Sequence, residues 1–421
     1  MCEIININGV TFLFSPFANI ETASLGIFLP VGSRFETDST KGIAHFLEHM
    51  LFKGSANYSY RRIKEEIEGR GGALNAFTSQ EITAYYAGFL SKNLPLTLDI
   101  LLDMVFSPLL KERDIERERA VILEEIKMYN DLPAPRAIAI LDSLLWKNHP
   151  LGEEIIGRVD TVKKISRKDL EKFSKAHYIP SNAVVSFGGN FSKSMIIDLI
   201  KRKASTGIKR SEFKTIKPSA CKGINVKTEK KELQQCQLCL GFRAPSFQEQ
   251  YKLAIQLMHV IMGANMSSRF FEELREKKSL CYDISTEVRR YRDSGAFLVH
   301  LGLDKAKVPT AIKAILKELT KLKEKDVPGR ELSRAKDYLL GQTAMSFERP
   351  QGRMFYLAES YITEGKIYEF ADIKKKITKI TSAEIRQLAN KIFSFKDICI
   401  SCVGNIDDKL DKEIKCLKQT L

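Results

Sequence analysis

The sequence predicts an α+β protein that consists of two halves with similar topology. Short strand-like apolar patterns alternate with longer helical patterns throughout the 421 residues. Segments of the first half also recur in the second half: Ile165 and Gly189 are matched by Ile380 and Gly404, at the same offset of 215 in the numbering. A chain of this length is expected to form two or more domains. These observations favour a repeated α+β unit over one large domain.

The elements of the first half follow from its hydrophobic pattern. Strand-length apolar stretches occur at residues 10–15, 23–31, 73–77, 83–90 and 184–188. Helical periodicity covers residues 43–51, 61–70, 94–106, 112–130 and 170–176. The double glycine Gly71-Gly72 predicts a break between the helix 61–70 and the strand pair that follows it.

The second half repeats this pattern with different side chains. The helix after Asp326 is matched with the helix after Asp114, at an offset of 212. Residues 205–231 are rich in lysine, threonine and serine and have little periodicity. We therefore expect a first domain at residues 1–204, a linker or hinge at 205–231 and a homologous second domain at 232–421.

The composition is that of a globular protein with excess positive charge. Hydrophobic residues make up 44% and charged residues 28%, and the net charge is +15. The lysines are spread along the chain and alternate with apolar residues, as on solvated helix faces, so we expect no nucleic-acid partner. Asp99 and Asp103 interrupt the most apolar segment, and we expect no membrane partner. The start Met1-Cys2-Glu3-Ile4 resembles neither a signal peptide nor a presequence, which favours a cytoplasmic location.

Four of the eight cysteines form two C-x-x-C pairs, Cys236/Cys239 and Cys399/Cys402. Both pairs fall in strand-like runs, where residues three apart point to opposite faces. Their separation in the sequence also exceeds that of zinc ribbons. We therefore expect free, partly buried thiols and no metal site at these cysteines.

The most informative motif is His45-Phe46-Leu47-Glu48-His49. On a helix, positions i, i+3 and i+4 share one face, so His45 and His49 can bind one metal ion with Glu48 beside it. That arrangement suits a hydrolytic zinc site. Asp38, Ser39 and Thr40 offer N-cap oxygens for this helix. A buried helix with incidental histidines is the alternative, but only six histidines occur in the whole chain.

A third metal ligand is expected from the acid-rich helix 112–130, whose candidates are Glu116, Glu118, Glu124 and Glu125. At about 100° per residue, Glu118 and Glu125 fall on one stripe with Val121, Ile122 and Tyr129. A carboxylate on an apolar face is costly to bury unless a cation neutralises it. Glu125 is therefore the predicted ligand and Glu118 a supporting acid that orients a histidine. Glu124 remains an alternative ligand.

These residues resemble the pitrilysin-type (M16) metallopeptidases, which carry an inverted zinc motif. Residues 42–54 (GIAHFLEHMLFKG) resemble the family's zinc motif, and residues 118–125 resemble its distal segment, in which two glutamates seven apart serve as supporting acid and ligand. Residues 149–152 and 178–182 also resemble family segments, so His149 and His177 are expected to be structural. The likeness extends over nearly the whole chain. It is nearest to the subfamily of the mitochondrial processing peptidase β subunit and bacterial processing-protease-like enzymes.

The resemblance implies two α/β-sandwich halves that form a clamshell around one Zn²⁺ per chain. Glu48 and Glu118 would be the catalytic acids, and His45, His49 and Glu125 the metal ligands. Residues Asn75 and Ala76 would belong to an edge strand that binds a peptide, and Arg275 and Tyr282 would bind the peptide carbonyl. Because both the zinc motif and the Arg/Tyr pair lie in one chain, the resemblance favours a self-sufficient endopeptidase, as a homodimer, that acts on unfolded peptides or presequence-like segments. The alternative is a non-catalytic scaffold, like the core subunits of respiratory complexes.

Overall fold

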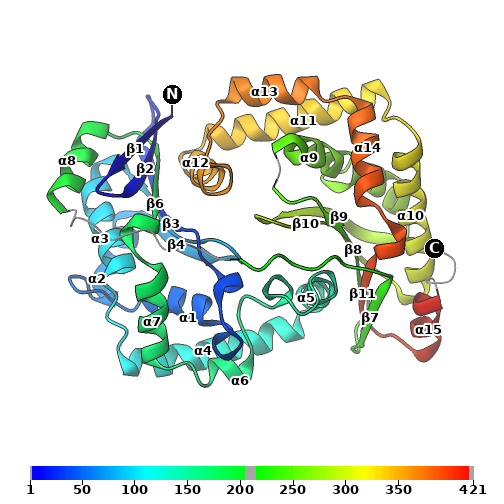
Figure 1. Ribbon diagram of the computed structural model, residues 1–421, viewed down its shortest axis with the longest axis horizontal. Helices are drawn as coiled ribbons and strands as arrows, with labels where there is room; N and C mark the ends of the chain where they lie inside the picture. The colour runs from blue at the N-terminus through cyan, green and yellow to red at the C-terminus, as the bar shows by residue number, and fades with distance from the viewer. Residues whose placement is uncertain (1, 204–214, 248, 417–421) are drawn as a thin grey trace. The chain divides into compact units, whose positions relative to one another are not determined.

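The structure of the chain, a computed structural model, describes residues 2–203, 215–247 and 249–416. They form two compact units, each of which contains parts of both sequence halves (Figure 1). Unit 1 comprises Met1–Lys127, Glu154–Thr215 and Ala344–Glu369; unit 2 comprises Met128–Glu153, Ile216–Thr343 and Phe370–Leu421. The two predicted α+β halves are therefore confirmed, although the units do not follow the contiguous division at residues 204 and 232.

The sheet of unit 1 has six strands in the order β1-β2-β6-β3-β5-β4. The strands are β1 Glu3–Ile7, β2 Val10–Pro16, β3 Thr22–Leu29, β4 Ala73–Thr78, β5 Thr83–Leu90 and β6 Val184–Gly189. Strands β2 and β6 are parallel, whereas the other neighbours are antiparallel. Only β1 was not predicted; its hairpin turn, Asn8-Gly9, has positive φ at both residues, which is the conformation that an Asn-Gly pair favours.

One face of this sheet packs against helices that precede or follow the strands in sequence. The helices of the first half in unit 1 are α1 Ile43–Leu51, α2 Tyr60–Ile67, α3 Leu94–Phe106, α4 Glu112–Asp131, α6 Val159–Val162, α7 Arg167–His177 and α8 Lys193–Lys203; α4 continues into unit 2. Leu25 and Ile27 of β3 share a buried core with Phe46 of α1 and Leu101 of α3. This packing fixes the helix that carries the histidine motif against the sheet.

The other face of the sheet is covered by α12 Pro350–Glu364, which comes from the second half of the sequence. Phe28 and Val184 pack against Met354 of this helix. The Ser186 hydroxyl donates a hydrogen bond to the Met354 carbonyl at 2.8 Å. At Gly188, a Cβ would lie 2.3 Å from a backbone oxygen of α12, so glycine permits this close approach.

Unit 2 contains a five-stranded sheet in the order β7-β11-β8-β10-β9. The strands are β7 Asn225–Lys230, β8 Cys236–Ala244, β9 Cys281–Arg290, β10 Gly295–Leu303 and β11 Cys399–Gly404. Strands β7 and β11 are parallel and the other neighbours antiparallel, so the order matches β2-β6-β3-β5-β4 of unit 1. Strand β6 begins at Val184 and β11 at Cys399, which is the offset that the repeat predicted.

The helices of the second half are α9 Glu249–Gly263, α10 Val308–Glu324, α11 Gly329–Phe347, α13 Phe370–Lys379, α14 Ser382–Ile392 and α15 Asp408–Cys416, besides α12; α11 continues into unit 1. Helix α4 begins at Glu112 and α11 at Gly329, so the predicted offset of 212 between these helices was wrong. The predicted linker was also wrong in part, because β7 lies within residues 205–231. Residues 205–214 of that linker lie outside the described residues.

Helix α5 Pro133–Leu145 comes from the first half of the sequence but packs on the sheet of unit 2, beside β8 and β11 (Figure 1). Leu141 and Leu145 share a core with Leu298 and Val403. The Ser401 hydroxyl donates to the Ala137 carbonyl at 2.6 Å, as Ser186 does to α12 in unit 1. The two sequence halves thus exchange one helix each, and each exchanged helix covers one face of the sheet formed by the other half.

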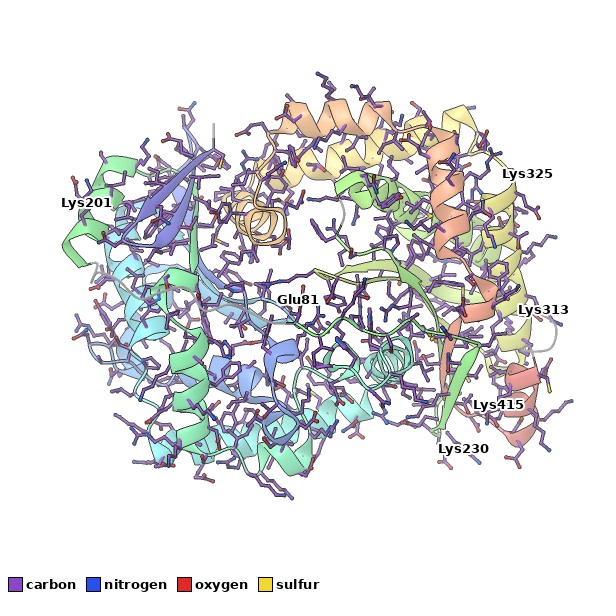
Figure 2. All side chains as sticks on the ribbon, in the orientation of Figure 1. Glu81, Lys201, Lys230, Lys313, Lys325 and Lys415 are labelled. Carbon is purple, nitrogen blue, oxygen red and sulfur yellow. The ribbon has the colours of Figure 1, made fainter. Side chains whose placement is uncertain are left out.

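The positive charge is distributed over many elements. Lys201, Lys230, Lys313, Lys325 and Lys415 lie on or beside different helices and strands and are all exposed (Figure 2). This distribution agrees with the solvated faces expected from the sequence. None of the helices described has both the length and the apolar character that a membrane crossing requires.

Candidate metal centre

The motif helix α1 begins at Ile43, and its N-cap residue Gly42 has a φ of +94°. The Glu36 carboxylate accepts hydrogen bonds from the backbone N–H groups of Gly42 and Ala44, each at 2.9 Å, and so satisfies the start of the helix. The predicted caps at Asp38, Ser39 and Thr40 were wrong, because these residues form a separate 3₁₀ turn whose hydroxyls bond locally, to Thr37 among others. A carboxylate before that turn takes the capping role instead.

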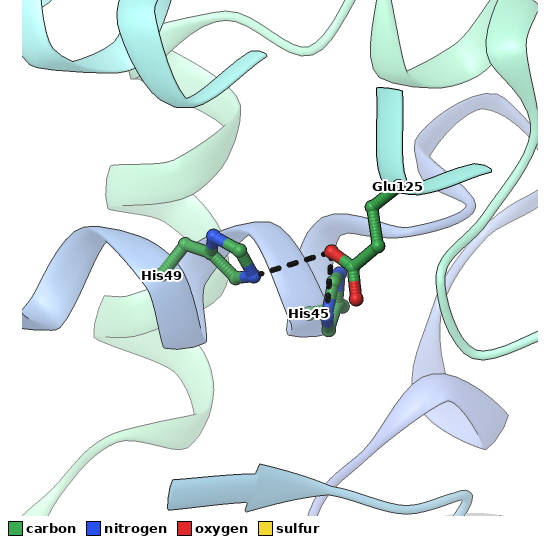
Figure 3. Close-up of side chains that lie close together, drawn as sticks. All are labelled: His45, His49 and Glu125. Carbon is green, nitrogen blue, oxygen red and sulfur yellow. Dashed lines mark ion pairs between the residues drawn. The ribbon is translucent and has the colours of Figure 1, made fainter. Parts of the chain in front are cut away.

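Three side chains from two helices converge beside α1 (Figure 3). Glu125 Oε2, on α4, lies 3.8 Å from His45 Nε2 and 3.6 Å from His49 Nε2. One potential ligand atom from each residue lies within 4.8 Å of the other two. Ligands of a tetrahedral zinc ion lie about 3.4 Å apart. Within the described part of the chain, no other such group of three His, Cys, Asp or Glu residues occurs.

The protonation of this group favours metal binding. Burial, and then the neighbouring His49, lowers the pKa of His45 to about 4, so this imidazole is neutral at pH 7. Neutral imidazole is the form that binds a metal. Burial raises the pKa of Glu125, and a cation at the centre would offset the cost of its charge. Two imidazoles and one carboxylate fit zinc, with a coordination position left for water.

Glu118, which precedes Glu125 by about two turns of α4, supports His49 from behind. Its carboxylate lies 3.1 Å from His49 Nδ1 and 2.5 Å from Lys53 Nζ. Burial alone would raise the pKa of Glu118, but the hydrogen bonds from His49 and Lys53 outweigh it and lower that pKa. The ionised carboxylate accepts a hydrogen bond from Nδ1–H of His49, so that Nε2 of the same ring faces Glu125. Lys53 was not predicted, although its spacing of four from His49 is the spacing that brings side chains together on a helix.

The other acids of α4 face elsewhere. Glu124 is largely exposed and pairs with Lys127 at 2.7 Å, so the structure does not bring it to the histidines. Glu116 is likewise exposed and pairs with Arg119. Of the two alternatives for the third ligand, Glu125 is the residue that lies beside the histidines.

The helical stripe used to choose Glu125 was partly wrong. Val121 and Tyr129 are 49% and 40% exposed, whereas Ile122 and Ile126 are buried. The apolar pattern of α4 identifies the side of the helix on which Glu118 and Glu125 lie. The boundary of the buried face, however, depends on which neighbouring elements pack against it, and a helical wheel does not contain that information.

Glu48 lies on α1 between the two histidines in sequence, and its carboxylate accepts a hydrogen bond from the Thr78 hydroxyl at 2.5 Å. Burial raises the pKa of Glu48; Thr78 and His49 oppose this rise, Glu125 adds to it, and the pKa stays above its usual value. A carboxylate with a raised pKa is a better proton acceptor in catalysis. Thr78 ends the edge strand β4, so this strand and the motif helix meet at Glu48.

Comparison with known proteins gives consistent matches over both halves. Residues 15–159 match the family model described as "Insulinase (Peptidase family M16)" and residues 164–339 match "Peptidase M16 inactive domain". A Bacillus subtilis protein named "Uncharacterized zinc protease YmxG" is 31% identical over 92% of this chain and 94% of its own length. A Rickettsia felis protein named "Uncharacterized zinc protease" is 33% identical over 92% of this chain and 93% of its own length.

The chain belongs to peptidase family M16.

Solved structures share the fold of this M16 chain. A protease from Helicobacter pylori superposes with a TM-score of 0.90 at 23% identity, over 96% of this chain and 99% of that one. The Pseudomonas fluorescens structure titled as a peptidase M16 inactive domain gives a TM-score of 0.88 at 18% identity, over 96% and 98% of the two chains. The family description of the second half as an inactive domain agrees with the sequence, since residues 164–339 contain no H-x-x-E-H motif.

The predicted peptide-binding residues of this M16 chain lie in both units. Asn75 and Ala76 are on β4, at the edge of the first sheet, and the Ala76 N–H donates to the Asn75 side chain at 2.8 Å. In unit 2, the Arg275 guanidinium lies 4.5 Å from the centre of the Phe271 ring and 5.2 Å from that of Tyr282. Arg275 is on a π-helical segment, Phe271–Lys277, and Tyr282 is 76% exposed. The structure therefore brings Arg275 and Tyr282 together, and likewise Asn75 and Ala76.

The remaining histidines of the M16 chain have structural partners. His149 accepts a hydrogen bond from the Leu151 N–H at 3.1 Å. His177 packs against Phe173, with ring centres 4.6 Å apart and the ring planes tilted by 57°. His259, on α9, lies 2.7 Å from the Thr286 hydroxyl, and His300 lies 2.9 Å from the Gln237 side chain.

Proposed function

We propose that this chain is a zinc-dependent endopeptidase in which His45, His49 and Glu125 hold one Zn²⁺ and Glu48 is the general base. The observation that carries the proposal is the proximity of three side chains, neutral His45, His49 and Glu125, to the Glu48 carboxylate, whose pKa is raised. Each part has a use in peptide hydrolysis, and a structural metal site would not require Glu48.

The bound metal would supply Lewis acidity, which activates water and polarises the scissile carbonyl. Glu48 accepts a proton from the attacking water and returns it to the leaving amine. Thr78, by its hydrogen bond at 2.5 Å, keeps the Glu48 carboxylate oriented during both transfers. Glu118 and Lys53 hold His49 in one tautomer and one orientation throughout.

The substrate we propose is an extended, unfolded peptide or a presequence-like segment. Strand β4 is an edge strand, so a peptide can add to it by backbone hydrogen bonds with little dependence on its side chains. Asn75 and Ala76 would form part of this edge, and Thr78 at the end of the same strand would bring the peptide towards Glu48. Arg275 and Tyr282 would donate to the peptide carbonyl and stabilise its developing negative charge.

The test compares the wild type with Glu48→Gln. We expect the variant to bind one zinc per chain and to lose about 10³-fold in the rate of cleavage of an unfolded peptide library, because general acid–base catalysis contributes about that factor. Zinc is measured by metal analysis with and without chelator, and the cuts are mapped by mass spectrometry. Undiminished turnover by Glu48→Gln would contradict the role of Glu48. A wild-type chain that binds zinc and cleaves nothing would favour the scaffold.

We also propose a homodimer, a cytoplasmic location and a place among the processing-peptidase-like M16 proteins. The presence of both the zinc motif and the Arg275/Tyr282 pair in one chain supports a dimer of self-sufficient subunits. Light scattering of the purified protein tests the dimer, and cell fractionation tests the location.

A further inference from the structure

The two C-x-x-C motifs of unit 2 lie next to each other on the paired strands β8 and β11. In the antiparallel register, Cys402 is opposite Leu238 and Cys399 is opposite Gly241. Because alternate residues of a strand point to opposite faces, each motif places one cysteine on each face of the sheet. This geometry prevents chelation within a motif, as the sequence predicted, but it allows thiols from different parts of the chain to meet.

On one face of the sheet, Cys402 and Cys236 lie near each other, since Cys402 is opposite Leu238, which shares its face with Cys236. Both side chains are buried, with exposures of 1% for Cys236 and 0% for Cys402. This burial protects both sulfurs from soluble reagents. The pair is therefore a natural control within the same sheet.

On the other face, Cys399 meets Cys221, which precedes β7. The two Sγ atoms are 3.4 Å apart. Cys399 is buried under α5, where it belongs to the core shared with Leu141, whereas Cys221 is partly exposed. The sulfurs of a disulfide are about 2.05 Å apart, so they need to approach by only about 1.4 Å to form a bond.

The surroundings of Cys221 favour its reactive form. The hydrogen bond from Cys399 lowers the pKa of Cys221 to about 7 against the opposing effect of burial, and Arg243 and Asn225 also lower it. The Asn225 amide nitrogen lies 3.6 Å from the sulfur. The Cys399 pKa is raised, first by the same hydrogen bond and then by burial. Cys221 is also the more exposed of the two thiols, so a soluble reagent reaches it first; Cys221 is thus the attacking thiolate, and Cys399 is the resolving thiol beside it.

We propose that Cys221 and Cys399 form a redox site that closes to a reversible disulfide when the protein meets a peroxide. The Cys221 thiolate attacks one peroxide oxygen, the O–O bond breaks, and hydroxide leaves and takes up a proton, which gives a sulfenic acid. The Cys399 sulfur then loses its proton and attacks the Cys221 sulfur; the S–O bond breaks and water leaves. In total, two thiols and one hydrogen peroxide give one disulfide and two waters. An external dithiol reverses the bond.

Closure would fasten the segment before β7 to the sheet. Lys222 follows Cys221 directly and is exposed, and Asn225 begins the strand that pairs with β11. In the dithiol form this segment can open locally, whereas a bond to Cys399 would hold its start against β11. Trypsin cleavage after Lys222 should therefore slow by about tenfold on oxidation, since cleavage follows local opening.

The experiment treats the reduced, full-length protein with hydrogen peroxide, alkylates the remaining thiols and maps the peptides by mass spectrometry. We expect a cross-linked peptide pair that joins Cys221 to Cys399, with the loss of two hydrogens, which dithiothreitol abolishes. Cys236 and Cys402 should remain thiols that alkylate only after unfolding. Oxidation of Cys221 to sulfinic acid without a cross-link, a Cys239–Cys399 bond, or full alkylation of Cys221 would each overturn the proposal.

Variants separate this site from general damage. Cys221→Ser should abolish the bond and the slower trypsin cleavage while zinc binding stays unchanged. Cys236→Ser, the matched control, should retain the bond. Cys399→Ser should leave Cys221 as a sulfenic acid that dimedone labels. A bond between protein copies that disappears in Cys416→Ser, with no intramolecular pair, would contradict the inference.

Discussion

Units 1 and 2 have the same core strand order, but among the residues described only unit 1 has a candidate metal centre. In unit 1, α1 presents His45 and His49 to Glu125. In unit 2, α9 carries His259, which hydrogen-bonds to Thr286 at 2.7 Å. The same arrangement of sheet and helices can thus carry a candidate metal centre in one unit and a hydrogen-bonded core histidine in the other.

What the two units share is the contact between sheet and exchanged helix. Ser186 and Ser401 are equivalent strand residues, and each donates to a backbone carbonyl, at Met354 and Ala137 respectively. The proposed chemistry therefore depends on a few side chains of α1, α4 and β4, whereas the fold depends on contacts that both units retain.

The largest effect should come from removing a proposed metal ligand in unit 1. Removing the histidine of α9 in unit 2 is the control. We expect His49→Ala to lose zinc affinity and peptide cleavage. Each should fall by more than the roughly 10–100-fold that the loss of a residue supporting a ligand costs. His259→Ala should keep both, because its imidazole hydrogen-bonds only within unit 2. Metal analysis and a fluorogenic peptide measure the two effects. Zinc loss in His259→Ala would remove the functional difference between the units.

A smaller loss is expected when the support behind His49 is weakened. Glu118→Gln removes the negative charge of the carboxylate that contacts both His49 and Lys53. Zinc affinity should therefore fall by about 10–100-fold. Glu116→Gln on the same helix, whose acid is exposed and pairs with Arg119, is the control and should bind zinc normally. Equal affinities for both variants, measured by competition with a chelator, would show that Glu118 does not support the centre.

The pH dependence of the zinc-free protein should sharpen the comparison of His45 with His259. The pKa of His45 in the folded state, about 4, is below its ordinary value of 6.5. Between pH 4 and pH 6.5 the unfolded chain therefore binds more protons at His45 than the folded chain does. The contribution of neutral His45 to the free energy of unfolding is present above pH 6.5 and is lost as the pH falls towards 4. We expect His45→Gln to reduce the loss of unfolding free energy from pH 7 to pH 5 by about 1–2 kcal/mol.

Burial also lowers the pKa of His259, so His259→Gln should act in the same direction. Urea unfolding at both pH values measures the difference. A His45→Gln protein with the same acid sensitivity as the wild type would show that His45 is not held neutral.

The smallest effect concerns the contact that the units share. Ser186→Ala and Ser401→Ala each remove one buried hydrogen bond to an exchanged helix, and each should cost about 1 kcal/mol of unfolding free energy. The effects should add in the double variant, since the two serines lie in different sheets. A clear loss for one variant and none for the other would show that the helices are not held equivalently.

Much of this architecture could be predicted from the sequence. The strands of the first half other than β1, the motif helix and α4 follow from periodicity, and the offset of 215 between repeated segments identified β6 and β11 as equivalents. Glu125 could be preferred over Glu124 because a helical pattern separates apolar from polar sides. These features depend on residues that are close together in the sequence, so they can be read from local patterns.

Other features depend on contacts between distant residues. Glu36 caps α1 across a 3₁₀ turn, and Thr78 reaches Glu48 from another element, so neither has a local signal. The helix exchange was not predicted either. The pattern of α5 or α12 tells which side is apolar, but it does not tell which of two similar sheets that side will cover.

The helix exchange also sets an order of events during synthesis. Phe28 and Val184 of the first sheet are covered by Met354, which lies far beyond both in the sequence. At about 5–20 residues per second, the ribosome needs roughly 10–30 s to extend the chain from Val184 to Met354. Until then one apolar face of the nascent first sheet has no helix to cover it, so it is open to chaperones or to aggregation. The part of the chain that bears the proposed metal ligands is made first, yet it is among the last to acquire its complete core.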